Sequence, residues 1–226
     1  MKLSWRAEWP MWLLIGWMFA LAALTWPWAP DRIPVHWNVA GEIDRYGGKA
    51  AGLLVLPSMA MGIYLLTVVL PAVDPGRANY PQFSRAYSVI RLALVALFAV
   101  IYGTVHLWIR GRAVSIAALV PLLVGVLFVV LGNQLGKIRP NWFVGIRTPW
   151  TLSSKTAWMK THRLAGWLFV GWGLAIVATS VLGPRWSLPS LITGAVSITI
   201  FLPVYSYLVW RSDPEKIPPA GTLPAE

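Results

Sequence analysis

Six long apolar stretches, separated by short polar segments, dominate the pattern of the chain. They cover residues 9–29, 51–70, 88–109, 113–132, 164–182 and 188–210. A helix needs about 20 apolar residues to cross the hydrocarbon core of a bilayer, and each stretch comes close to that length. Because every backbone N–H in hydrocarbon needs a partner within the protein, a helix is the expected form. The pattern predicts an all-α integral membrane protein with six transmembrane helices.

The first stretch also has features of a secretory signal, because Lys2 and Arg6 precede it and residues 20–22 resemble a cleavage site. Its full spanning length argues for a retained helix instead. The stretch also ends in Trp26 and Trp28, and indole rings at a span end prefer the headgroup layer of a membrane. We therefore expect a first span that remains in the protein.

The composition supports a membrane protein and indicates its orientation. Hydrophobic residues make up 57% of the chain and charged residues 12%, against about 25% charged in an ordinary soluble domain. The net charge of +11 does not gather on one solvated face, so direct nucleic-acid binding is not expected. Of the 19 Lys and Arg residues, 13 fall on one side of the six predicted spans. The positive-inside rule makes that side, which carries both termini, the cytoplasmic side.

Four parts of the chain follow from these spans. Residues 1–73 hold the first two spans with an external segment, 74–112 the third span, and 113–210 the last three spans. Residues 211–226 are rich in proline, which predicts a disordered tail.

Small residues four apart are expected to let helices pack closely inside the bundle. Such pairs are Gly16/Ala20, Ser58/Gly62, Ala99/Gly103, Gly171/Ala175 and Ser190/Gly194.

The external segment 30–49 is too long and too rich in charged residues of both signs to be a simple turn. Pro34 favours an extended conformation at Ile33, so residues 33–37 are expected to be extended. Balanced charge with histidine and tryptophan suits a folded cap that recognises a ligand. Its candidate recognition residues are Pro34, His36, Trp37, Asn38, Gly41 and Asp44. A metal site built from Asp31, His36 and Asp44 is a less favoured alternative.

The second long connection, residues 133–163, is basic and cytoplasmic in this topology. It contains six Lys or Arg residues, no acidic residue, and three interleaved tryptophans. Ser153 or Ser154 is positioned to cap a helix that begins at Lys155. That helix would place Trp158 and His162 on one face. Composition favours a lipid-facing interfacial connector, and a docking surface for an anion or an acidic partner is the alternative.

These two connections carry a resemblance to a known family. Residues 133–166 resemble the signature of the SdpI family, which consists of bacterial membrane proteins typified by an immunity protein against a secreted killing peptide. Residues 30–44 are similar to the extracellular motif that often precedes this signature in the same chain. The signature residues are Asn133, Pro140, Asn141, Gly145, Arg147, Thr148, Pro149, Trp150, Thr151, Trp158, His162, Arg163 and Gly166.

The resemblance implies a multi-pass protein of the bacterial cell membrane, with the lipid bilayer around it. It implies two partners, a secreted toxin peptide outside and a transcriptional repressor that is sequestered at the membrane inside. The family signature carries no catalytic assignment and no cofactor. A membrane transporter, or a lipid- or envelope-related protein of unassigned role, is the alternative function.

The residue types present argue against an enzyme and against a bound metal or cofactor. The chain has no cysteine and no HExxH motif, and no Asp or Glu occurs from residue 75 to residue 212. None of the six predicted spans contains an acidic residue, whereas a proton-coupled transporter usually needs an ionisable residue inside the membrane. Arg91 is expected to extend from the third span to the cytoplasmic surface. Recognition is therefore favoured over catalysis and transport.

Overall fold

The computed structural model describes residues 5–112 and 114–217. Six of its helices are long and apolar enough to cross a membrane, which confirms the predicted fold class. The elements, in chain order, are α1 (Trp5–Thr25), β1 (Ile33–Trp37), β2 (Ile43–Gly47), α2 (Lys49–Val73), the 3₁₀ helix η1 (Arg77–Phe83), α3 (Ser84–Ile109), α4 (Ile116–Leu135), α5 (Pro149–Leu152), α6 (Lys155–Leu182) and α7 (Pro184–Arg211).

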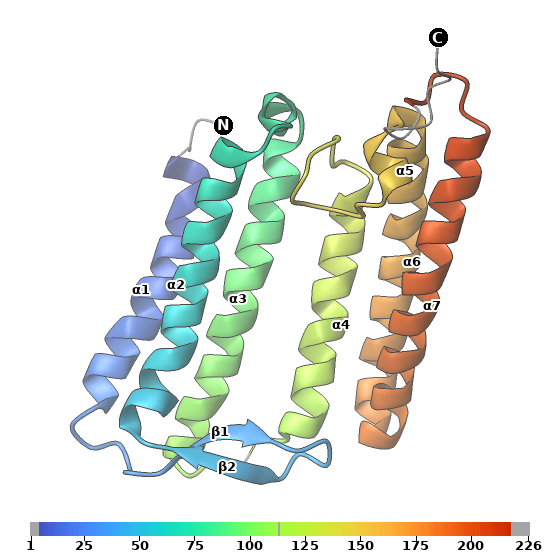
Figure 1. Cartoon of the computed structure of the whole chain (residues 1–226). Coiled ribbons are helices and arrows are strands. Elements are labelled where there is room, and N and C mark those ends of the chain that lie inside the picture. Colours follow the sequence, from blue (N-terminus) through green and yellow to red (C-terminus); the bar gives the residue numbers. More distant parts are fainter. Residues whose placement is uncertain (1–4, 113, 218–226) are drawn as a thin grey trace.

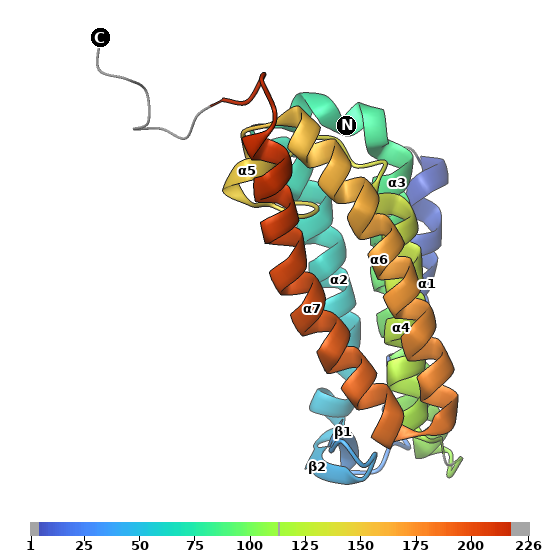
Figure 2. The same cartoon turned by 90° about the vertical axis from the view of Figure 1, so that its right-hand side faces the viewer.

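The long helices stand side by side and run up and down between two ends of the molecule (Figure 1). The end where α1 begins and α7 finishes is called here the termini end. The opposite end carries β1 and β2 and is called the hairpin end (Figures 1 and 2). The structure thus separates the two long connections onto opposite ends, as the sequence predicts. Which end faces the cytoplasm stays a prediction.

The hairpin end is built from an antiparallel pair of strands that pairs Ile33 with Gly47 and Trp37 with Ile43. The predicted extended stretch 33–37 is confirmed as β1, whereas β2 was not predicted. Its turn is closed by Asn38, whose side-chain oxygen accepts hydrogen bonds of 3.0 Å from the backbone N–H groups of Ala40 and Glu42. The all-α membrane domain therefore carries a small β cap.

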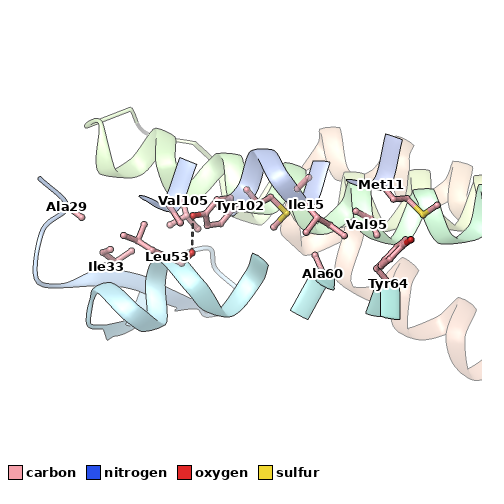
Figure 3. Packing of buried hydrophobic residues seen from close by; sticks show 13 residues of the cluster. Met11, Ile15, Ala29, Ile33, Leu53, Ala60, Tyr64, Val95, Tyr102 and Val105 are labelled. Carbon is pink, nitrogen blue, oxygen red and sulfur yellow. Dashed lines mark hydrogen bonds between the residues drawn. The ribbon is translucent and has the colours of Figure 1, made fainter. Parts of the chain in front are cut away.

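Packing divides the helices into two units. The first unit consists of α1, α2 and α3, and its buried core includes Met11, Ile15 and Leu53 (Figure 3). Tyr102 of α3 lies in this core and donates a 2.9 Å hydrogen bond to the carbonyl oxygen of Leu53 (Figure 3). That bond satisfies a phenol that would otherwise be unpaired in hydrocarbon.

The second unit consists of α4, α6 and α7, and its helices approach through glycines. A Cβ atom on Gly132 would lie 2.7 Å from the carbonyl oxygen of Gly166, and one on Gly125 would lie 2.8 Å from that of Gly173. The glycines on each helix are seven residues apart, which is two helical turns. Small residues thus do allow close packing. Of the expected four-residue pairs, Ser190/Gly194 on α7 does so, because a Cβ on Gly194 would clash with the indole ring of Trp172 on α6. A Cβ on Gly16, Gly62 or Gly171 of the other pairs would meet nothing within 4 Å.

A buried ion pair corrects the prediction that the spans contain no acidic residue. Because α1 begins before the apolar stretch, Glu8 lies within the first membrane-spanning helix. Arg91 donates to its two carboxylate oxygens at 2.7 and 2.9 Å, and Tyr64 donates to it at 2.8 Å. Arg91 is 1% exposed, so it does not extend to the surface as predicted. The side chain stays inside because Glu8 and Thr67 accept its hydrogen bonds there.

The described part of the tail after α7 contacts the junction between α5 and α6. The backbone N–H of Ile217 donates to the carbonyl oxygen of Ser153 at 2.9 Å, and Asp213 accepts a hydrogen bond from the hydroxyl of Ser154. Residues 213–217 thus contact the start of α6, and the disorder of the tail stays a prediction. The remainder of that prediction, residues 218–226, lies outside the described residues.

Candidate functional site

A cavity of about 540 Å³ lies at the hairpin end, where the two helical units meet. We call it the hairpin cavity. It is covered by β1 and walled by α2, α3, α4 and α7, with a lining that is mostly aliphatic. Representative lining residues are Val35, Val55, Met59, Val105, Val124 and Leu191. Its volume falls within the range of about 300 to 1,000 Å³ that is common for ligand sites.

Four of the predicted recognition residues line the hairpin cavity. They are Pro34, His36, Trp37 and Asn38, all contributed by β1 and the turn that follows it. Pro34 is buried, Trp37 and Asn38 are half-buried, and His36 is exposed. The strand thus places a ring and an amide at the rim of an apolar space.

The other two predicted residues support the hairpin rather than line the cavity. Asp44 on β2 lies 2.6 Å from Nδ1 of His36, and both side chains are largely exposed. Gly41 has φ +83°, and a Cβ there would lie 2.6 Å from that of Ala117 on α4. Glycine is therefore required at this position both by the turn and by the close contact between the hairpin and α4.

The alternative metal site is not assembled. The carboxylate of Asp31 lies 3.9 Å from Nζ of Lys49. Within residues 5–112 and 114–217, no three His, Cys, Asp or Glu side chains come together as metal ligands would. His36 and Asp44 form a polar pair on the hairpin, of which only His36 lines the cavity.

One polar side chain of the cavity was missed from the sequence. Ser187 on α7 is 1% exposed, and its hydroxyl has no hydrogen-bond partner among the described residues. It lines the hairpin cavity. A buried hydroxyl without a partner is costly, and this one lies within the cavity wall rather than on its accessible surface. The sequence has no signal for this, since serine in a span is common.

At the termini end, the family signature forms a buried cluster around His162. The ring of His162 stacks on that of Trp158 at 4.1 Å, and both residues are fully buried. Nδ1 of His162 lies 2.8 Å from the carbonyl oxygen of Trp158, and Nε2 accepts a 2.9 Å hydrogen bond from the N–H of Ile146. These partners require the neutral ring with its proton on Nδ1. Gly145, with φ +110°, leaves the space that this ring fills.

Two predictions about this segment are confirmed by the cluster. Ser154 caps α6 and accepts a 2.8 Å hydrogen bond from the N–H of Ala157. Trp158 and His162 share one face of α6, as their spacing predicted. Helix α6 begins at Lys155, as the predicted cap requires, and continues into the apolar stretch that starts at residue 164.

The loop before α5 is held by three further signature residues. The side chain of Asn141, which is 2% exposed, donates to the carbonyl oxygens of Arg139 and Val144 at 2.9 Å. Thr148 and Thr151 form a capping box at the start of α5. Buried polar groups with complete hydrogen bonding make this loop a rigid structural element, so the predicted lipid-facing connector is only partly correct.

The acid that anchors this loop was also missed. Asp74, which follows α2 and is 1% exposed, accepts hydrogen bonds from the N–H of Trp142 and the hydroxyl of Tyr80. It therefore ties the signature loop to the first helical unit. Its sequence signal is its isolation, since it is the last acid before a long acid-free interval that is rich in bases.

The remaining signature residues point outward or pack between helices. Asn133, Arg147, Pro149 and Arg163 are exposed, while Pro140 is half-buried. Trp150 packs edge-on against Tyr207 of α7, and Gly166 packs against α4. Of the signature bases, Arg147 and Arg163 are therefore accessible to a partner, whereas His162 is not.

The signature cluster and the hairpin both lie in regions that match known protein families. Residues 137–209 match the model of the SdpI/YfhL protein family, and residues 13–61 match a domain of unknown function, DUF1648. The resemblance to the SdpI family is confirmed. The SdpI-like region holds most of the signature cluster, and the second match holds the hairpin.

A curated relative matches most of the chain. The chain is 25% identical over 162 residues to the protein named Immunity protein SdpI of Bacillus subtilis (strain 168). This similarity spans 72% of the present chain and 75% of the relative. No solved structure matches the chain. The chain is thus an integral membrane protein related to an immunity protein.

Proposed function

We propose that this protein is a non-catalytic immunity protein of a bacterial cytoplasmic membrane, which protects that membrane against a secreted antimicrobial peptide. The observation that carries the proposal is the hairpin cavity, an apolar space beneath a strand that supplies the predicted recognition residues. Similarity to Immunity protein SdpI supports the same role. By the bias of basic residues, the hairpin end would face outward, where such a peptide arrives.

The cavity suits the apolar side chains of a membrane-active peptide. Such peptides present one apolar face and one polar face to the membrane surface. The volume is sufficient for a few side chains but not for a whole helix, which is about 10 Å wide. His36, which lines the cavity and is paired with Asp44, offers a polar partner to the other face. Capture of the apolar anchors would keep the peptide from inserting into the bilayer.

The test is survival of a sensitive bacterial host that expresses the chain and is exposed to the cognate peptide. We expect the intact chain to increase survival over an empty vector. Val124→Phe on α4 fills the hairpin cavity and should abolish that protection. Val126→Phe on the same helix is the matched control, because Val126 is 47% exposed and does not line the cavity.

The two outcomes separate two levels of the proposal. If the intact chain gives no survival advantage, the immunity role is wrong. If the Val124→Phe variant protects as well as the intact chain and is present in the membrane in equal amount, immunity stands and the cavity is not its site.

A second function is favoured by the exposed bases of the termini end. Arg147 and Arg163 point outward beside the rigid signature cluster, and they would attract an acidic surface of a repressor held at the membrane. Capture of a small DNA-binding protein should then fall in Arg147→Gln and Arg163→Gln variants. Arg185→Gln, at the hairpin end, should leave capture unchanged. Capture that is equal in all variants would remove this function.

One observation bears on the alternative of a transporter or lipid-related protein. An ionisable pair does lie among the membrane-spanning helices. Glu8 and Arg91 satisfy each other and have further partners in Thr67 and Tyr64. Such full pairing favours a structural role over a transport pathway.

A further inference from the structure

A second cavity, of about 650 Å³, lies at the termini end between the start of α3 and the end of α4. It is separate from the hairpin cavity and shares no lining residue with it. Polar and basic side chains line it, among them Arg85, Asn133, Gln134, Lys137 and Arg139. We call it the basic pocket.

The charge of the basic pocket is not balanced within the described chain. Its lining holds three bases and no acid, and no described acidic residue forms an ion pair with Arg85, Lys137 or Arg139. Nζ of Lys137 donates to Gln134 at 3.1 Å, and Arg139 donates only a long bond of 3.3 Å to a backbone carbonyl. Most donors of the three bases therefore remain free for an anion.

The depth of the pocket matches the headgroup layer of a bilayer. Helix α4 has 20 residues, which corresponds to about 30 Å and thus to the thickness of the hydrocarbon core. Its end at Leu135 therefore lies at the boundary between hydrocarbon and headgroups. Asn133 lies in the last turn of α4, and Lys137 and Arg139 follow it, so all three are placed near the level of the lipid phosphates.

We propose that the basic pocket binds the phosphate of an anionic phospholipid headgroup. Arginine guanidinium groups recognise phosphate through paired hydrogen bonds, and lysine adds a point charge. Basic pockets between membrane helices on the positively charged side suit such headgroups. The bound lipid bridges α3 and α4, which are the helices through which the two units meet. This inference does not depend on the proposed immunity function.

The test measures retention of phospholipid by the purified full-length protein, using native mass spectrometry with phosphatidylglycerol and, separately, phosphatidylcholine. We expect phosphatidylglycerol to be retained and phosphatidylcholine to be lost. Arg85→Gln and Lys137→Gln should each weaken retention about fivefold. Asn133→Asp, which adds a negative charge to an exposed position of the lining, should weaken it by a similar factor.

Matched controls are Arg77→Gln and Lys160→Gln, which remove exposed bases of the termini end outside the pocket. Retention should be unchanged in both. Equal loss in controls and pocket variants, with unchanged helix content, would overturn the proposal in favour of general surface charge. Equal retention of the two lipids would also overturn it. Displacement of phosphatidylglycerol by millimolar inorganic phosphate would assign the pocket to a soluble anion instead.

Discussion

The helices of the two units are held together by different kinds of contact. Inside a membrane, lipid tails are as apolar as leucine, so burial of apolar side chains gives little reason for helices to associate. The unit of α1, α2 and α3 is held by polar partners that pair away from lipid, above all Glu8 with Arg91. In the unit of α4, α6 and α7, the backbones of α4 and α6 are in contact at Gly125/Gly173 and Gly132/Gly166. The first unit therefore depends on paired charges. The second depends on glycines, whose lack of a side chain lets the backbones touch.

The largest effect should come from breaking the buried ion pair between Glu8 and Arg91. Arg91→Leu leaves Glu8 buried without its partner, and removing one member of a buried pair costs about 3 to 5 kcal/mol. We expect a corresponding fall in the free energy of unfolding in detergent. The double variant Glu8→Leu/Arg91→Leu should recover most of that loss, because no unpaired charge remains. A double variant as unstable as Arg91→Leu would show that packing, rather than charge, holds this unit.

The link between the two units should be the next most sensitive point. Asp74→Ala removes the acceptor of Trp142 and Tyr80, which should lower the free energy of unfolding by about 2 to 3 kcal/mol. Asp44→Ala, at the exposed hairpin, is the control and should change stability little. If the two variants are equally stable, the signature loop is not anchored through Asp74.

Replacing glycine by alanine should change the free energy of unfolding in opposite directions at two positions. Gly132→Ala places a Cβ against the carbonyl oxygen of Gly166 and should destabilise by about 1 to 2 kcal/mol. Gly171→Ala meets nothing within 4 Å and should stabilise by about 0.5 kcal/mol, because alanine favours the helix more than glycine does. Thermal unfolding in one detergent compares them directly. The same sign for both would mean that α4 and α6 tolerate a wider separation.

The smallest effect concerns the tail and depends on pH. The hydrogen bond from Ser154 holds the pKa of Asp213 below its ordinary value of 3.8. A carboxyl with a lowered pKa stabilises the folded form above that ordinary value, and this stabilisation is lost as pH falls through the lowered pKa. Docking of residues 213–217 should therefore be constant near neutral pH and weaken only in strong acid. Protease cleavage after α7, followed against pH, measures this.

Asp213→Asn is the matched variant, since it keeps the shape of the side chain without the titrating group. Its cleavage should not change with pH in that range. A tail of the intact chain that loosens between pH 7 and 5 would contradict the assignment to Asp213.

Sequence alone predicted the elements more reliably than their contacts. Helix positions followed from hydrophobic length, and the cap of α6 and the pairing of Trp158 with His162 followed from local spacing. Of the hairpin recognition residues, four line the cavity as a group because they are neighbours on one strand and its turn. Such local features can be predicted from a sequence because the interacting residues lie within a few positions of one another.

The contacts between distant parts were not predictable in the same way. Glu8 lies outside its apolar stretch, and nothing in the sequence joins it to Arg91, which is 83 residues away. Asp74 with Trp142, and the three bases of the basic pocket, are likewise brought together from separate elements.

Hydrophobic length and charge bias therefore determined that the chain spans a membrane with six helices, and predicted the way it points. Only the tertiary structure decided which ionisable groups are paired in the interior, where two cavities form and which glycines let helices touch. The physical reason is that insertion into hydrocarbon depends on each segment by itself, whereas pairing and close packing depend on how the segments are rotated and placed against one another.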